Sequence, residues 1–260
     1  MKHMELNKKI DLLIISILLV IIVLVSLALS LKPLIVLLMY LLSASVYLSL
    51  RERKNFKKIF WAILIFGIIF GLGFDFVVTF NKGWIVNELF FPFRLFGFYP
   101  IIDDILGFIL MTLFIVVFYE HFIDDEKNKK VSKNIKWILI VSIAALSFIF
   151  AVYLINSSLL RIPYAYLMTG LMAICFPIVF GIGRQRFMIK FLKTAGFSFI
   201  VWFVLELVCL KNSGWIFPGE YVGLVNIWGL RFPLEELFFW MMWYSVTIVS
   251  YYEFFIDDKL

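Results

Sequence analysis

The chain has little of what soluble enzymes use to build their sites. Only 16% of its 260 residues are charged, and it has two cysteines and two histidines. Cys175 and Cys209 lie in apolar runs and form no CxxC pair, so the sequence predicts no disulfide framework. It offers no ligand set for zinc, haem or non-haem iron and no glycine-rich nucleotide motif. We therefore expect no metal, no cofactor and no nucleic-acid partner.

Apolar residues dominate instead. They make up 63% of the chain, and the mean hydropathy is +1.01, which is typical of a polytopic protein of the cell membrane. Segments of about 20 apolar residues are long enough to cross a bilayer. We expect about eight such helices in an all-α fold, the first of them uncleaved, near 10–31, 33–50, 58–80, 100–123, 136–155, 163–183, 188–210 and 233–256.

The connections between these segments alternate in charge. One set has only scattered basic residues, such as Lys82 and Arg161. The other set is strongly basic, and by the positive-inside rule it is cytoplasmic. Both termini are then cytoplasmic, which fits an even number of spans. The basic set comprises Lys2, Lys8, Lys9, Arg51, Arg53, Lys54, Lys57, Lys58, Lys127, Lys129, Lys130, Lys133, Lys136, Arg184, Arg186 and Lys190.

The chain also repeats itself. The segment PIIDDILGFILMTLFIVVFYEHFIDD (100–125) aligns without gaps to PLEELFFWMMWYSVTIVSYYEFFIDD (233–258), which places Asp103 on Glu236 and Ile102 on Glu235. Upstream, NKGWIV (81–86) matches NSGWIF (212–217), and the register of that match places Asp75 on Glu206. Self-similarity of this kind predicts two halves, 1–130 and 131–260, within one membrane domain. Each half has four spans, so the halves run parallel.

Acidic residues gather at the non-cytoplasmic side of this topology. Asp75 and Glu206 lie inside apolar spans, where a charge costs on the order of 3 kcal/mol at the bilayer centre and less near the interface. Such residues usually face the bundle interior or a cavity. The outer connections are too apolar for solvent loops and too rich in glycine and proline for spans, so we expect them to cover that cavity as interfacial or re-entrant segments. The gathered acids are Asp75, Glu88, Asp103, Asp104, Glu206, Glu220, Glu235 and Glu236.

Glu235 and Glu236 follow Pro233 at the start of the last span. Proline and acids at a helix N-terminus are a common capping arrangement, and that interpretation stays open. On an α-helix, Glu236, Trp240 and Trp243 share one face. An acid above stacked aromatic rings can donate a proton and then hold a cation against the ring faces.

The segment GWIFPGEYVGLVNIWGLRFPLEELFFW (214–240) resembles the motif of the heterodimeric and fused lycopene cyclases of carotenoid synthesis. Those are small membrane proteins or domains built from two related halves. The match includes the tryptophan, the Pro-x-Glu-Glu and the aromatic run after it. It is good over 214–256, fair over 75–125 and weak over the first two helices of each half.

The resemblance implies a redox-neutral cyclisation of the ends of lycopene or a related linear carotenoid, started by a proton and passing through a carbocation. Such a site needs one protonated acid, one carboxylate and a dry aromatic pocket, and neighbouring acids in an apolar site allow one of them to stay protonated. Water must be excluded, because it would trap the cation as an alcohol. Other enzymes of carotenoid synthesis are candidate partners beside the lipid bilayer.

The resemblance and the acid pattern together give a set of expected site residues. Glu235 and Glu236 are the expected acid/base pair, Asp103 and Asp104 their counterpart, and Asp75 and Glu206 tune the proton or act as a second base. The expected substrate-binding residues are Trp84, Trp215, Trp240, Trp243, Phe239, Pro233 and Arg231. Arg231 and Arg94 are expected to pair with carboxylates or to anchor at the interface.

Three alternatives remain open at this stage. A carotenoid hydratase, or a cyclase of prenyl-extended carotenoids, would generate the same cation from the same acid. A small transporter or ion relay would also use intramembrane acids and parallel repeats. A non-catalytic membrane protein that only binds a polyene would need the aromatic pocket without the chemistry.

Overall fold

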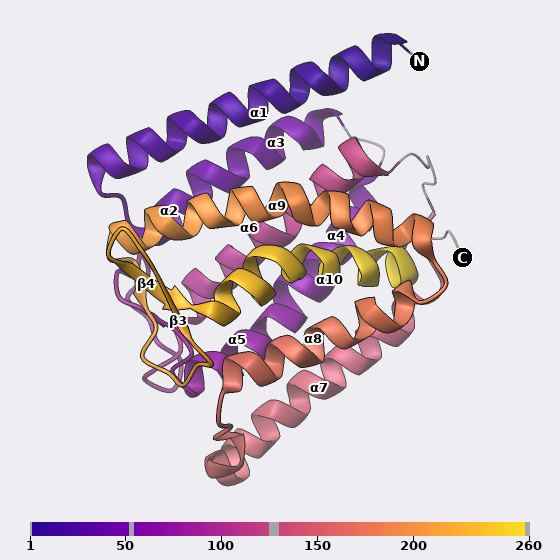
Figure 1. Ribbon diagram of the computed structural model, residues 1–260. Helices are drawn as coiled ribbons and strands as arrows, with labels where there is room; N and C mark the ends of the chain where they lie inside the picture. The colour runs from indigo at the N-terminus through magenta and orange to yellow at the C-terminus, as the bar shows by residue number, and fades with distance from the viewer. Residues whose placement is uncertain (1, 52–54, 125–129, 258–260) are drawn as a thin grey trace.

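The fold is a bundle of long helices with short strands at one end (Figure 1). A computed structural model describes residues 2–51, 55–124 and 130–257, with side chains described from residue 7 onward. Four of the expected cytoplasmic basic residues, Arg53, Lys54, Lys127 and Lys129, lie outside the described residues.

The helices of the first half succeed one another with little interruption. They are α1 (Lys2–Leu29), α2 (Pro33–Leu37), η1 (Leu38–Leu42), α3 (Ser43–Arg51), α4 (Phe56–Ala62), η3 (Ile63–Phe70), α5 (Gly71–Phe80), α6 (Ile101–Phe118) and η4 (Tyr119–Ile123). The π-helical segments η1, η3 and η4 join the α-helices on either side of them without a break. The chain therefore forms continuous helices over 33–51, 56–80 and 101–123.

The second half of the chain is also helical. Its helices are α7 (Ile135–Asn156), the short 3₁₀ segment η5 (Ser157–Leu160), α8 (Ala165–Gly181), α9 (Gln185–Lys211), η6 (Glu236–Trp243), α10 (Tyr244–Tyr251) and η7 (Tyr252–Ile256). Both η6 and η7 are π-helical and flank α10 without a break.

Among the described residues, six helices are long and apolar enough to cross a membrane. They span Asn7–Leu29, Pro33–Arg51, Phe56–Phe80, Ile101–Ile123, Ile135–Leu160 and Gln185–Lys211. Helices also occupy the other two expected ranges: the shorter apolar helix Ala165–Gly181, and the helix formed by η6, α10 and η7. The chain is therefore an all-α membrane protein.

The described strands all lie at one end of the bundle, which we call the strand end (Figure 1). β1 (Ile85–Val86) pairs antiparallel with β2 (Trp215–Ile216) and joins the two long connections. β3 (Leu224–Ile227) and β4 (Leu230–Pro233) form a hairpin. The start of α1 and the end of η7 lie at the opposite end of the bundle.

The helices sort into a packed interior and an apolar exterior. Phe114, Val116 and Val249 are fully buried between α6, α9 and α10. By contrast, α1 and α7 expose leucine and isoleucine along most of their length, as at Leu24 and Ile140. An exposed apolar surface of this extent is expected where lipid, not water, surrounds the helix.

Buried ion pairs tie the two halves together at the end opposite the strands, which we call the ion-pair end. The Nζ of Lys58 lies 2.6 Å from Asp257, and the Nζ of Lys190 lies 3.1 Å from Asp124. Lys58 also lies 3.7 Å from Glu120. Buried charges are costly unless paired, so these contacts fix how the halves meet.

Two tyrosines repeat this exchange between halves. The Tyr119 hydroxyl donates a hydrogen bond to Glu253, and the Tyr252 hydroxyl donates one to Glu120. Each half therefore supplies the hydroxyl that satisfies the buried glutamate of the other.

Candidate active site

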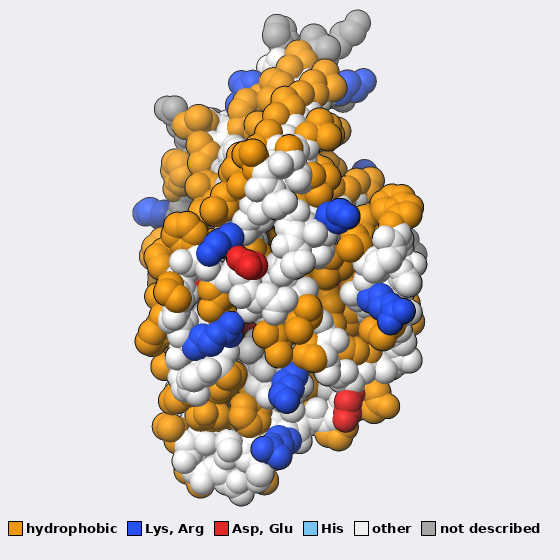
Figure 2. Space-filling model, turned by 90° about the vertical axis from the view of Figure 1, so that its left-hand side faces the viewer, with side chains coloured by type: hydrophobic (Ala, Val, Ile, Leu, Met, Phe, Trp, Pro, Cys, Tyr) orange, Lys and Arg blue, Asp and Glu red, His pale blue; other side chains and the backbone are white. Residues whose placement is uncertain are grey.

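A cavity of about 780 Å³ of empty space, its open mouth included, lies at the strand end of the bundle. Figure 2 looks onto this end and shows scattered basic side chains among hydrophobic ones, with little acidic surface. Most of the predicted acids lie beneath that surface. The cavity is lined by Pro33, Leu34, Leu37, Asp75, Trp84, Val86, Asp103, Asp104, Gly107, Phe108, Met111, Trp202, Leu205, Glu206, Trp215, Phe217, Glu236 and Trp240.

This cavity brings together residues that are far apart in the sequence. Five of the six acids expected from the sequence line it: Asp75, Asp103, Asp104, Glu206 and Glu236. Three of the expected aromatic residues line it as well: Trp84, Trp215 and Trp240. The outer connections form its cover, because Trp84, Val86, Trp215 and Phe217 come from the segments around β1 and β2.

One pair of acids comes from the first half. Asp75, on α5, is fully buried, and its carboxyl lies against that of Asp104, at the start of α6. Two carboxyls in contact away from water repel strongly if both are ionised, so such a pair holds a proton. Tyr99 lies beside the pair. Burial, together with the charges of Asp75 and Asp104, raises the pKa of Tyr99 above its usual range, so its hydroxyl keeps its proton.

The second pair comes from the second half and has dedicated hydrogen-bond donors. Glu206, on α9, accepts a 2.8 Å hydrogen bond from Nε1 of Trp215. Glu236, at the start of η6, accepts a hydrogen bond from the hydroxyl of Tyr166, which is fully buried on α8. Both carboxyls face the cavity close enough to interact. Each donor favours the ionised form of the carboxyl that it contacts, whereas two charged carboxyls away from water repel each other, so this pair also holds a proton.

Asp103 and Glu235 have a different task from their neighbours. The two oxygens of Asp103 accept backbone N–H bonds from Phe90 at 2.7 Å and from Phe91 at 3.0 Å. Oε1 of Glu235 accepts a 2.7 Å bond from the backbone N–H of Val222. Both side chains hold an outer connection onto the start of a helix. Asp103 still lines the cavity, whereas Glu235 does not.

These contacts match the acids of the two halves in a register that differs by one residue from the gapless alignment, which had placed Asp103 on Glu236. By contact, Asp103 corresponds to Glu235, and Asp104 corresponds to Glu236. The second half therefore contains one extra residue between its paired acids and the tyrosine at the ion-pair end. A π-helical turn accommodates one additional residue in a helix, and η6 (Glu236–Trp243) is such a stretch, whereas α6 is α-helical throughout. Because Asp103 takes the role of Glu235, the isoleucine at position 102 does not leave the first half short of an acid.

The same π-helical stretch changes which aromatic side chains reach the cavity. Trp240 follows Glu236 by four residues and lines the cavity with it. Trp243 was predicted on the same face from α-helical periodicity, but it does not line the cavity. In a π-helix, residues seven positions apart no longer lie on the same face. Phe239 lines a neighbouring cavity instead.

Two further predicted binding residues lie away from the cavity. Pro233 is buried at the end of β4, and Arg231 is exposed on the same strand. Arg94 donates hydrogen bonds to the carbonyl oxygens of Phe98 and Val86. Among the described residues, neither arginine forms an ion pair with a carboxylate, so Arg94 acts by fastening the outer connection.

Sequence reasoning missed Tyr166 and Tyr99 as partners of the acids. Tyr166 is the second residue of α8, which follows the left-handed residue Tyr164, and it lies 70 positions from Glu236 along the chain. Nothing in its local sequence separates it from the many other tyrosines of the chain. Only the tertiary fold shows its role.

A second cluster of acids lies at the ion-pair end. Oxygen atoms of Glu120, Asp124 and Asp257 all lie within 4.8 Å of one another, which is a spacing that a metal ion could bridge. Lys58 and Lys190, however, already place positive charge against these carboxylates. We interpret the cluster as a structural ion-pair network.

Comparisons of the chain with protein-family models, with curated proteins and with solved structures find no match. Function must therefore be inferred from the cavity and its residues.

Proposed function

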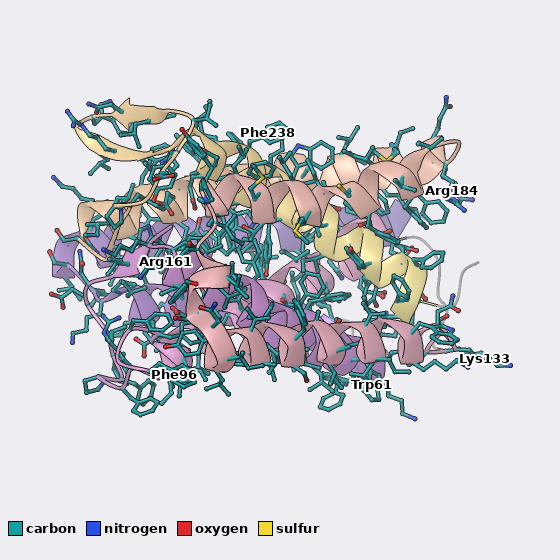
Figure 3. The ribbon with its side chains drawn as sticks, turned by 90° about the horizontal axis from the view of Figure 1, so that it is seen from below. Trp61, Phe96, Lys133, Arg161, Arg184 and Phe238 are labelled. Carbon is teal, nitrogen blue, oxygen red and sulfur yellow. The ribbon has the colours of Figure 1, made fainter. Side chains whose placement is uncertain are left out.

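We propose that the chain crosses the membrane eight times, with both termini in the cytoplasm and with its two halves arranged in parallel. The reciprocal contacts between Lys58 and Asp257 and between Lys190 and Asp124 support two related halves. The exchanged tyrosine–glutamate bonds support the same relation. Lys133 and Arg184 lie together at one end of the bundle, away from Phe96 and Arg161, as that topology requires (Figure 3).

In this topology the acid cavity lies at the outer side of the membrane, and its chemistry suits a carotenoid cyclase. The observation that carries the proposal is a single covered cavity in which two carboxyl pairs face tryptophan rings. One pair supplies a proton, the other accepts one, and the rings stabilise positive charge between them. The resemblance of the segment 214–240 to membrane lycopene cyclases leads to the same reaction.

The proposed reaction begins with proton transfer from Glu236 to the terminal double bond of a linear carotenoid. Tyr166 donates to Oε2 of Glu236, which fixes the carboxyl and leaves Oε1 for the proton. Protonation leaves a tertiary cation on the substrate. The neighbouring double bond attacks that cation, and a new carbon–carbon bond closes a six-membered ring.

Loss of a proton then completes the reaction. The ring cation gives up a proton from an adjacent carbon to the ionised member of the Asp75–Asp104 pair, and the electrons of that C–H bond form the ring double bond. Protons gained and lost by the substrate balance, so the product is an isomer of the substrate. Protons return from Asp104 to Glu236 through the shared cavity. Trp84, Trp215 and Trp240 line the space in which the cation forms.

An ion relay is less well supported by the interior of the bundle. Between the two acid clusters, α6 and α10 carry no carboxylate; hydroxyl side chains such as Thr112 and Ser250 lie among buried apolar ones, and Phe118 stacks on Phe197 at 4.0 Å. A relay needs polar groups or water across such a stretch. A covered cavity at one side suits chemistry on a lipid-soluble substrate.

The direct test is expression of the chain in cells that accumulate lycopene, followed by chromatographic analysis of the extracted pigments. We expect cyclic products from the natural chain. The double variant Asp104→Asn/Glu236→Gln, which removes one acid from each carboxyl pair, should leave lycopene unchanged. If the natural chain is present in the membrane and lycopene stays linear, lycopene cyclisation is ruled out.

Tyr166→Phe is expected to lower turnover by about 10- to 100-fold. A hydrogen bond to a carboxyl group contributes about 1.5–3 kcal/mol, and its loss lets Glu236 rotate away from the substrate. Because the phenyl ring stays, substrate affinity should change little, so kcat should fall while KM stays nearly the same. Tyr164→Phe, exposed on the same helix end, is the matched control. Equal turnover in the two variants would contradict a positioning role for Tyr166.

A further inference from the structure

A second cavity of about 530 Å³ of empty space, its open mouth included, adjoins the acid cavity. Its walls come from η3, α5, α6, α8, η6 and α10, and they include Phe66, Phe70, Ala173, Ile174, Thr247 and Ile248. The two cavities share Phe108 and Trp240 as lining residues. None of the described carboxylates that line the acid cavity lines the second cavity. The second cavity is therefore apolar.

Aromatic rings run from one cavity into the other. The ring centroids of Phe108 and Trp240 are 5.8 Å apart in an edge-to-face arrangement, and Tyr244 stacks on Trp240 at 4.7 Å. Phe74 bridges Phe108 and Trp84, with centroid separations of 6.5 and 6.0 Å. The junction is therefore a frame of rings through which a flat, apolar chain can pass.

Two glycines shape the walls of the second cavity. A Cβ atom at Gly170 would lie 2.5 Å from the ring of Phe239, and one at Gly71 would lie 2.9 Å from the ring of Phe108. Both rings therefore lie directly against a helix backbone, which no other residue would allow without movement. This arrangement draws the rings back toward the helices and keeps the space between them open.

We propose that the second cavity binds the apolar chain of the substrate while one end of that substrate lies in the acid cavity. This inference rests on the proposed function, and it adds where the remainder of a long isoprenoid or polyene lies. The continuity through Phe108 and Trp240 selects this occupant over an unrelated lipid. Lipid tails are as apolar as the protein interior, so burial alone gives no preference in a membrane. Selectivity for a flat polyene then comes from packing against the rings.

The test measures how much lycopene stays with the purified protein. The background is Glu236→Gln, in which we expect bound lycopene to remain unconverted. Ala173→Phe fills the second cavity with a ring and leaves the acid cavity untouched. Ala144→Phe makes the same change on the exposed face of α7 and serves as the matched control. We expect Ala173→Phe to retain about tenfold less lycopene per protein than its parent, and Ala144→Phe to equal it.

A shorter substrate distinguishes binding in the second cavity from reaction in the acid cavity. An acyclic apocarotenoid with the same end group but a shortened chain needs less of the second cavity. In the otherwise natural chain, Ala173→Phe should slow conversion of lycopene by about tenfold and slow the short substrate much less. Equal slowing of both substrates, or undiminished retention of lycopene, would overturn the inference.

Photolabelling of the natural chain keeps the inference testable if Ala173→Phe does not fold. A photoreactive apolar isoprenoid should label peptides that contain Phe70, Ala173 or Thr247. Labelling confined to the lipid-facing surfaces of α1 and α7 would overturn the inference, as would a phospholipid found tightly bound in this cavity. In the natural chain, lycopene that is retained but gives no cyclic products would contradict the proposed function alone.

Discussion

Glu236→Gln is expected to reduce cyclisation by about 10²- to 10⁴-fold, which is the usual contribution of a positioned acid. Glutamine keeps the size of the side chain and can still accept the hydrogen bond from Tyr166. It cannot release a proton to the substrate. The variant should therefore fold and bind lycopene normally while losing its chemistry. Pigment analysis in lycopene-accumulating cells, normalised to the amount of protein, measures the loss.

The adjacent residue supplies the control. Glu235→Gln makes the same chemical change one position earlier, where the side-chain oxygen only accepts the backbone N–H of Val222. An amide oxygen can accept that bond equally, so activity should fall by less than about tenfold. If Glu235→Gln were the inactive variant and Glu236→Gln the active one, the assignment of the two glutamates would be reversed.

Lys58→Met is expected to destabilise the folded protein by about 3–5 kcal/mol, the usual cost of leaving a buried charge without its partner. Lys58 is fully buried, 2.6 Å from Asp257 and 3.7 Å from Glu120. Methionine has a similar length but leaves both carboxylates without this cation. Because the pair joins the two halves, the variant should lose its folded core as a unit.

Thermal unfolding of the purified protein in detergent measures this effect. Lys57→Met removes the same charge from the neighbouring, exposed position and should leave the melting temperature nearly unchanged. A double variant, Lys58→Met/Asp257→Asn, should recover part of the lost stability because it also removes the buried carboxylate charge that Lys58 faces. Equal melting temperatures for the two single lysine variants would show that the ion pair adds no stability.

Much of the architecture follows from the sequence because apolar length and acid placement are strong signals in a membrane protein. The helices, the clustering of Asp75 and Glu206 with the acids after Pro100 and Pro233, and the covering outer connections could all be predicted from the residues. These features depend on the cost of buried charge and backbone, which local sequence reveals.

The details of the site depend on geometry that local sequence does not carry. An α-helical wheel placed Trp243 beside Trp240, and only the π-helical turns of η6 separate them. A gapless alignment made Asp103 the counterpart of Glu236. The contacts instead make it the counterpart of Glu235, since both accept a backbone N–H of a connection. The choice between an α and a π turn depends on how the helix packs against α8 and α9, so it could not be predicted from the residues.

The extra residue in η6 also has a consequence for the choice of product. Identical acids at identical heights would give the cavity two equivalent walls, and a cation formed between them would meet the same base on either side. Instead, one wall carries two short aspartates and the other two longer glutamates, each with its own donor. In the proposed reaction this inequality removes the two-fold equivalence of the two walls. The substrate end then has one productive orientation, and the proton is lost from one carbon in preference to its neighbours.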